Sequence, residues 1–231
     1  MGDDTGETEN DMSLIIESDL GHDPDDLFAI TYLISAGVDI SAILIAPGDP
    51  DQIAIARLIC REVGLDIPIG VGKIGRDKLS SGSIHHDLLK HYGCSLCEEN
   101  DGLGTNVIDQ VWEPSTDVFV IGPLNSIGRY IGQYSHTFSR ATMQGGFVPY
   151  SLYRPEVALD KFEGKQSIAT FNLNGDVEGA KAFLAAPMPR RMVGKNVCHT
   201  VVFDKAQFAT FAPPRCRAAE LFHEAANLYF A

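Results

Sequence analysis

The sequence predicts an α/β protein whose single domain is built on a doubly wound, mostly parallel sheet. Short, apolar, β-branched segments alternate along the chain with segments of helical periodicity, which is typical of repeated strand–helix units. The first two predicted helices stop at glycines, as helices commonly do. A chain of 231 residues is long enough for one such domain with a sizeable core.

The predicted elements follow one another without an internal repeat or a linker. Residues 1–11 are acidic and nearly free of apolar side chains, so we expect a disordered lead-in before a domain that spans 12–231. The predicted strands are 12–16, 38–46, 67–71, 117–121, 137–143 and 197–203. The predicted helices are 27–34, 52–63, a turn at 86–91, one that ends at Gly132, 177–186, and a late helix at 221–230.

Composition and charge exclude several kinds of partner. The formal charge of −13 argues against a nucleic-acid surface, which needs Lys and Arg for phosphate contacts, and suits attraction of cations instead. The sequence has no apolar run long enough to span a bilayer and no signal peptide, so we expect a cytosolic protein. The single C-x-x-C, Cys94 to Cys97, has no second pair and does not support a zinc ribbon.

The segment from Glu17 to Asp26 carries five acidic side chains in ten residues, between the first predicted strand and the first predicted helix. It therefore lies at the carboxyl edge of the sheet, where open α/β sheets hold their ligands. Capping of the helix accounts for one or two of these carboxylates. Carboxylates this close repel one another unless a cation lies among them, so the segment predicts a metal site.

This segment resembles the D-x-D-x-G-x-D-D signature of the nucleoside hydrolases, the calcium-dependent N-ribohydrolases. Glu17 stands at the first Asp, Asp19 matches the second, and Asp25-Asp26 match the closing pair after two extra residues. Four further segments resemble family motifs in the same order along the chain: D-G-L-G at 101–104, G-P-L-N at 122–125, M-Q-G-G at 143–146 and the Asn-containing segment at 169–176. The resemblance implies a Rossmann-like nucleoside hydrolase fold and hydrolysis of a small-molecule nucleoside.

The resemblance also implies roles for particular residues. The implied metal is Ca²⁺, in preference to Mg²⁺, because carboxylate-rich oxygen ligation suits its flexible coordination. The implied metal ligands are Asp19, Asp25, Asp26, the backbone carbonyl of Ile121 and Glu224. Asp19 would also be the general base and His223 would serve the leaving base, while Asp25, Asn172 and Asn174 would bind the sugar. The role of Asp23 stays open.

Departures from the family pattern leave alternatives open. The Glu of the family's E-F-N is Thr170 here, the Asn of its early G-N turn is Asp49, and Glu98-Glu99 replace its His-Gly. A non-catalytic relative that binds or regulates is therefore one alternative. A magnesium-dependent phosphohydrolase is another, although Leu20-Gly21 does not supply the second acid that it needs.

Two histidines and the identity of the substrate remain equally open at this stage. His223-Glu224 would otherwise belong to an ordinary surface helix, and His199 is better interpreted as a structural histidine. The sequence does not name the base, distinguish ribose from deoxyribose, or fix the oligomeric state, a homo-oligomer included.

Overall fold

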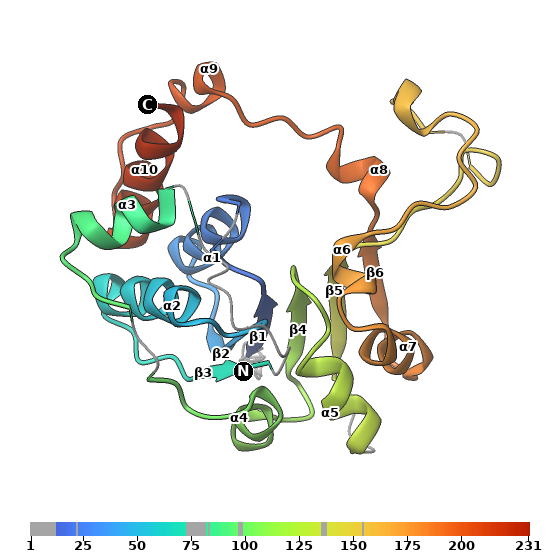
Figure 1. Cartoon of the computed structure of the whole chain (residues 1–231), viewed down its shortest axis with the longest axis horizontal. Coiled ribbons are helices and arrows are strands. Elements are labelled where there is room, and N and C mark those ends of the chain that lie inside the picture. Colours follow the sequence, from blue (N-terminus) through green and yellow to red (C-terminus); the bar gives the residue numbers. More distant parts are fainter. Residues whose placement is uncertain are drawn as a thin grey trace, which may run out of the picture.

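The computed structural model describes residues 13–21, 23–72, 82, 84–96, 99–134, 138–153 and 155–231. Six strands form one parallel sheet in the order β3-β2-β1-β4-β5-β6, with helices on both faces (Figure 1). This confirms the predicted α/β class and the doubly wound sheet. The predicted lead-in at 1–11 lies outside the described residues. The strands are Leu14–Ser18 (β1), Ile40–Ile45 (β2), Ile69–Val71 (β3), Asp117–Val120 (β4), Arg140–Gln144 (β5) and Arg190–Val193 (β6).

The helices cover the sheet and extend beyond it. None of those in the described ranges is long and apolar enough to cross a membrane. They are Asp25–Ser35 (α1), Pro50–Val63 (α2), Ile84–His91 (α3), Gly104–Val111 (α4), Ile127–Gln133 (α5), Phe171–Asn174 (α6), Val177–Ala185 (α7), Lys195–Cys198 (α8), Lys205–Phe208 (α9) and Arg217–Phe230 (α10), with a 3₁₀ turn at Asp160–Phe162 (η1).

Two hydrophobic clusters, one on each face, fix the layers. Successive residues of a strand point to opposite faces, so neighbours such as Ile15 and Ile16 belong to different clusters. The cluster that contains Ile16 packs against α1, α2, α3 and α10, and the one that contains Ile15 packs against α4, α5 and α7. Strands buried on both faces account for the continuous apolar runs of the sequence.

The chain order places a topological switch point between β1 and β4. The chain leaves β1 toward β2 on one side and reaches β4 on the other, so the carboxyl ends of β1 and β4 lie side by side, where open α/β sheets bind ligands. The approach is close, because a Cβ on Gly122 would lie 2.5 Å from the backbone nitrogen of Asp19. Both predicted metal-binding segments, the one after β1 and the one after β4, therefore lie at the same edge.

The late part of the chain differs from the prediction. The strand predicted at 197–203 is wrong: α8 ends at Cys198, and the following Val201 and Val202 are 73% and 61% exposed. Their β-branched side chains favoured a strand, but none of the strands in the described residues lies beside them to pair with. The sixth strand is instead β6, which pairs with β5. It was not predicted because it is only 4 residues long and begins with two arginines, so it has no apolar run.

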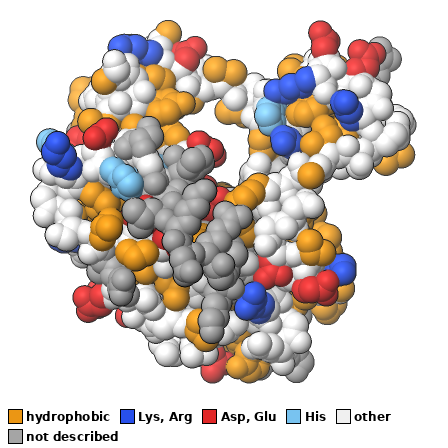
Figure 2. Space-filling view, viewed as in Figure 1, with side chains coloured by type: hydrophobic (Ala, Val, Ile, Leu, Met, Phe, Trp, Pro, Cys, Tyr) orange, Lys and Arg blue, Asp and Glu red, His pale blue; other side chains and the backbone are white. Residues whose placement is uncertain are grey.

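The C-terminal helix is attached through aromatic rings. Phe222 of α10 lies 4.8 Å from Phe28 of α1 between ring centroids, and Phe203 lies 5.5 Å from Phe28. Phe208 and Phe211 extend the same cluster. Figure 2 shows hydrophobic side chains gathered over these C-terminal elements. The cluster brings α10 beside α1, on the face that also carries α2 and α3.

Candidate functional site

The acidic turn, residues 19–26, joins β1 to α1 at the switch point. Asp19 follows the last residue of β1, whereas Asp25 and Asp26 form the first turn of α1. Carboxylates in a first helical turn are stabilised by the helix dipole, which allows the chain to gather them here. Gln52 of α2 donates a hydrogen bond to the backbone carbonyl of Asp19 (3.2 Å) and so fixes one side of the turn.

The carboxylates of the acidic turn influence one another. The Asp26 carboxylate is buried and accepts a hydrogen bond from the Ser18 hydroxyl (2.6 Å). Burial, and then the charges of Asp19 and Asp25, hold the pKa of Asp26 well above its usual range. Burial and the charge of Asp23 raise the pKa of Asp25 as well. Such mutual repulsion is what a divalent cation bound among them would relieve.

Glu17 has a different task from the aspartates. Its side chain is completely buried and accepts hydrogen bonds from the backbone N–H groups of Ser126 (2.5 Å) and Ile127 (3.0 Å), at the start of α5. Burial raises its pKa to about 8, although these N–H groups act in the opposite direction. Glu17, which stands at the first Asp of the motif, thus caps the N-terminus of α5.

The predicted ligand carbonyl and a predicted sugar-binding side chain do meet. The Asn172 amide donates to the Ile121 carbonyl oxygen (2.8 Å) and to the backbone and side-chain oxygens of Gln144 (3.0 and 2.7 Å). Asn172 therefore links the carboxyl ends of β4 and β5. Asn174 is exposed, and its side-chain oxygen accepts from the Thr170 N–H (3.3 Å), so it closes the α6 turn.

Two polar residues at this edge of the sheet were not predicted from the sequence as site residues. Gln144 completes the hydrogen bonding of Asn172, and its place at the end of β5 was the available signal. Asn125 is buried and donates to Asp176 (3.1 Å), while its Oδ1 has no partner among the described residues. Asn125 closes the G-P-L-N segment, which directly follows Ile121. An acceptor without a partner at this edge is available to a ligand.

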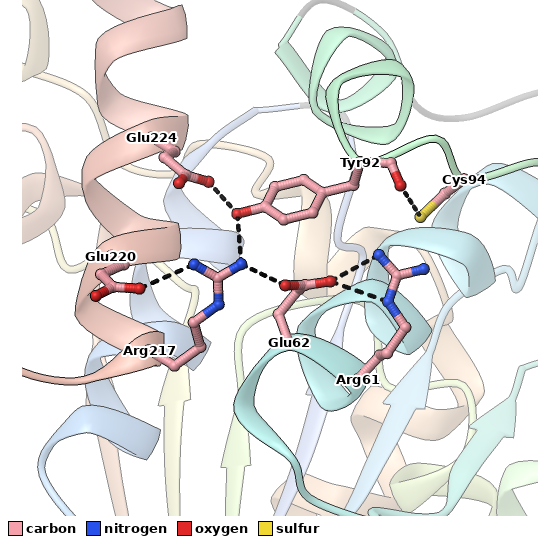
Figure 3. Close-up of polar contacts among 7 residues, drawn as sticks. All are labelled: Arg61, Glu62, Tyr92, Cys94, Arg217, Glu220 and Glu224. Atoms are coloured by element: carbon pink, nitrogen blue, oxygen red, sulfur yellow. Dashed lines mark hydrogen bonds and ion pairs between the residues drawn. The ribbon is translucent and has the colours of Figure 1, made fainter.

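The structure gives both predicted C-terminal residues other partners. Glu224 accepts a hydrogen bond from the Tyr92 hydroxyl (Figure 3). The ring of His223 lies 5.2 Å from that of Phe208. In the part of the chain that the structure describes, no group of three or more His, Cys, Asp and Glu side chains forms a ready metal site. The metal and leaving-group roles of these two residues stay predictions.

Glu224 belongs to the α10 network, which we define as Glu62, Tyr92, Arg217, Glu220 and Glu224. Arg217 binds both Glu220 (2.8 Å) and Glu62, and it also contacts the Tyr92 hydroxyl (3.3 Å) (Figure 3). Burial acts to raise the pKa of Glu62, but the hydrogen bonds from Arg217 and Arg61 outweigh this effect and lower the pKa. The network ties α10 to α2 and to the residue after α3.

His199 lies away from these groups, on the β6 side of the molecule. Its Nδ1 lies 2.7 Å from the Lys161 ammonium, and its ring packs edge-on against Phe162 at 5.4 Å. Burial and the charge of Lys161 lower the pKa of His199, which keeps the ring neutral. These contacts agree with a structural histidine. The C-x-x-C pair cannot be compared, because Cys97 lies outside the described residues.

Comparisons with known proteins agree with this architecture. No protein-family model matches the sequence. An uncharacterized protein of Aquifex aeolicus is 22% identical over 215 residues, which are 90% of this chain and 72% of that protein. A plant nucleoside hydrolase superposes with a TM-score of 0.69 at 17% identity, over 94% of this chain and 70% of that one. The inosine-uridine preferring nucleoside hydrolase of Bacillus anthracis gives 0.66 at 14% identity, over 94% and 76%.

These superpositions define the class of fold. The six-stranded parallel sheet and its helices match the nucleoside hydrolases over nearly the whole described chain, so the chain has the nucleoside hydrolase fold. The predicted resemblance is thereby confirmed at the level of the fold.

Proposed function

We propose that this protein hydrolyses the N-glycosidic bond of a nucleoside or a related N-riboside, using one bound Ca²⁺. The observation that carries the proposal is the crowding of carboxylates around buried Asp26 at the switch point of a nucleoside hydrolase fold. Ligands of open α/β sheets bind at this position. Proteins of the same fold are named for hydrolysis of nucleosides, which supports the reaction class.

The donor set fits a hard cation. Asp19, Asp25 and Asp26 offer carboxylate oxygens, and Ile121 offers a backbone carbonyl at the end of β4, all of them ligands that Ca²⁺ prefers. We leave Glu224 out of this set because it belongs to the α10 network, where Tyr92 donates to it, whereas the other donors lie in the segments that directly follow β1 or β4 along the chain. When bound, the cation would lower the pKa of a coordinated water and hold vicinal sugar hydroxyls. Mg²⁺ fits less well, since it demands strict octahedral geometry.

Individual side chains carry out proton transfer and sugar binding. Asp19, the first residue after β1, accepts the proton of the attacking water as a general base. Asp25 accepts a hydrogen bond from a ribose hydroxyl. The Asn172 amide, which Gln144 and Ile121 hold in place, exchanges one of those bonds for the sugar. The transition state carries positive charge on the sugar, which the neighbouring carboxylates stabilise.

A non-catalytic binding protein is the second candidate, because His223 packs against Phe208 and Glu224 is engaged by Tyr92. Such a protein would bind Ca²⁺ and ribose through the same carboxylates without turnover. It differs from the enzyme in one measurable respect, the release of free base.

The test is a turnover assay with inosine, adenosine, uridine and cytidine, with Ca²⁺ or with a chelator, together with calorimetry of Ca²⁺ and ribose binding. We expect free base to be released only with Ca²⁺, and no release by Asp26→Asn. Binding of Ca²⁺ and ribose without release of any base would establish the binding protein instead. A phosphate-ester panel serves as the control for a phosphohydrolase, and we expect no phosphate release.

A further inference from the structure

A buried carboxylate and a partly exposed imidazole face each other beside the acidic turn. Nε2 of His86, in the first turn of α3, lies 3.2 Å from Oδ2 of Asp51, in the first turn of α2. The Asp51 side chain is 0% exposed and that of His86 is 44% exposed. The other Asp51 oxygen accepts from the Gln52 N–H (3.0 Å), so the helix backbone holds the carboxylate in place.

Two hydrogen bonds bring this pair against the acidic turn. The Gln52 amide, next to Asp51, donates to the Asp19 carbonyl (3.2 Å). Gly82, four residues before His86, donates its N–H to the Gly21 carbonyl (3.0 Å). The first turns of α2 and α3 therefore adjoin the two ends of the segment from Asp19 to Gly21, and the Asp51–His86 pair lies between those turns.

The arrangement is that of an oriented acid–base histidine. The Asp51 carboxylate accepts a hydrogen bond from protonated Nε2, which leaves Nδ1 to exchange a proton with a ligand. His223, to which the family resemblance gives this task, contacts the Phe208 ring instead.

We infer that His86, oriented by Asp51, donates the proton to the departing base of the N-riboside. This inference rests on the proposed function. The C–N bond breaks with its electron pair going to the base nitrogen, and Nδ1 of His86 supplies the proton. The attacking water forms the new C–O bond and gives its proton to Asp19. After release of the products, Asp19 loses this proton to solvent and His86 takes one up. His86 is then a catalytic residue and Asp51 a positioning residue.

The leaving group provides the test, because only some leaving groups need a proton. We compare inosine with 4-nitrophenyl β-D-ribofuranoside, whose nitrophenolate departs unprotonated. His86→Gln should lower kcat for inosine by about a hundredfold or more and change that for the nitrophenyl riboside by about twofold at most. Asp51→Asn should show the same selectivity with a smaller loss, about tenfold, because the imidazole keeps its place less well.

His91→Gln is the matched control, since His91 is exposed in the last turn of the same helix. It should leave both substrates unaffected, and circular dichroism should show all three variants folded. An equal loss on both substrates, or no loss in His86→Gln, overturns the inference while the proposed function stands. If the unaltered protein with Ca²⁺ hydrolyses neither substrate, the proposed function fails and the inference fails with it.

Discussion

The acidic turn and the α10 network both collect carboxylates, but they neutralise them in different ways. In the α10 network Arg217 binds Glu62 and Glu220 directly. In the acidic turn, the buried Asp26 accepts a hydrogen bond from a serine hydroxyl, and its pKa is raised by burial and then by the charges of two further carboxylates. The first arrangement is complete as it stands, whereas the second is the one for which we propose a bound cation.

This difference distinguishes a structural cluster, the α10 network, from the proposed ligand site, the acidic turn. Carboxylates that repel one another destabilise the folded protein, so such a group points to a functional role. Carboxylates paired with an arginine are equally well explained by attachment of a helix. Helix α3 connects the two regions, because its first turn carries the Asp51–His86 contact and Tyr92 follows its last turn. Four predictions test this distinction.

The largest effect is expected for Asp19→Ala. We expect it to remove Ca²⁺ binding and to lower turnover by at least about a thousandfold, because one side chain serves as ligand and general base. Calorimetry and initial rates measure the two losses. Glu220→Gln, which neutralises a carboxylate of the α10 network, should change neither. Unaltered Ca²⁺ affinity in Asp19→Ala would mean that the site lies elsewhere.

Asp26→Asn should change stability in opposite directions with and without Ca²⁺. Without Ca²⁺, removal of a buried charge beside Asp19 and Asp25 should raise the free energy of unfolding by about 1 kcal/mol. With Ca²⁺ at about a hundred times its Kd, the unaltered protein should gain about 2.7 kcal/mol that the variant lacks. Urea titrations in Ca²⁺ and in chelator measure both. A variant that loses stability equally in both media contradicts the cation site.

His85 gives a pH dependence of known sign. It is completely buried in α3, and burial lowers its pKa to about 4, with the charge of His86 acting in the same direction and those of Asp23 and Asp51 against it. Between pH 4 and 6.5 the unfolded chain therefore binds more protons than the folded one, so stability falls as the pH falls. The expected loss is on the order of 3 kcal/mol.

His85→Phe should remove this part of the pH dependence, and His91→Gln, at an exposed position of the same helix, should retain it. Urea titrations at a series of pH values between 4 and 7 provide the measurement. Parallel profiles for the two variants would show that another group causes the loss.

The sequence predicted the features that depend on local pattern. Asp19, Asp25 and Asp26 follow a strand and open a helix, so their place at the sheet edge follows from the alternation of elements. Asn172 and Ile121 belong to two different segments that resemble family motifs, and the hydrogen bond between them agrees with that resemblance. Features that depend on distant partners were not predictable. Asp51 and His86 are 35 residues apart and meet only because two helices begin beside each other.

Tertiary packing also explains why some predictions from the sequence were wrong. The 197–203 segment has strand-forming residues, but Val201 and Val202 are exposed without a partner strand in the described chain, while Arg190–Val193 forms β6 because β5 has a free edge beside it. Glu17 matched a motif position, yet the start of α5 lies close enough to take its carboxylate as a cap.

The smallest effect is expected for Arg217→Met, which breaks the paired cluster and leaves the acidic turn intact. The Arg217 side chain is 40% exposed, so each of its ion pairs contributes little, but it contacts Glu62, Glu220 and Tyr92 at once. We expect the free energy of unfolding to fall by about 1 to 2 kcal/mol, and by less at high salt, where exposed charges are screened. Urea titrations at low and high salt measure this change. Because the α10 network contains no proposed ligand of the cation, the gain in stability on adding Ca²⁺ should equal that of the unaltered protein. A reduced gain would show instead that α10 and Glu224 take part in the metal site, and the separation between the two clusters would fail.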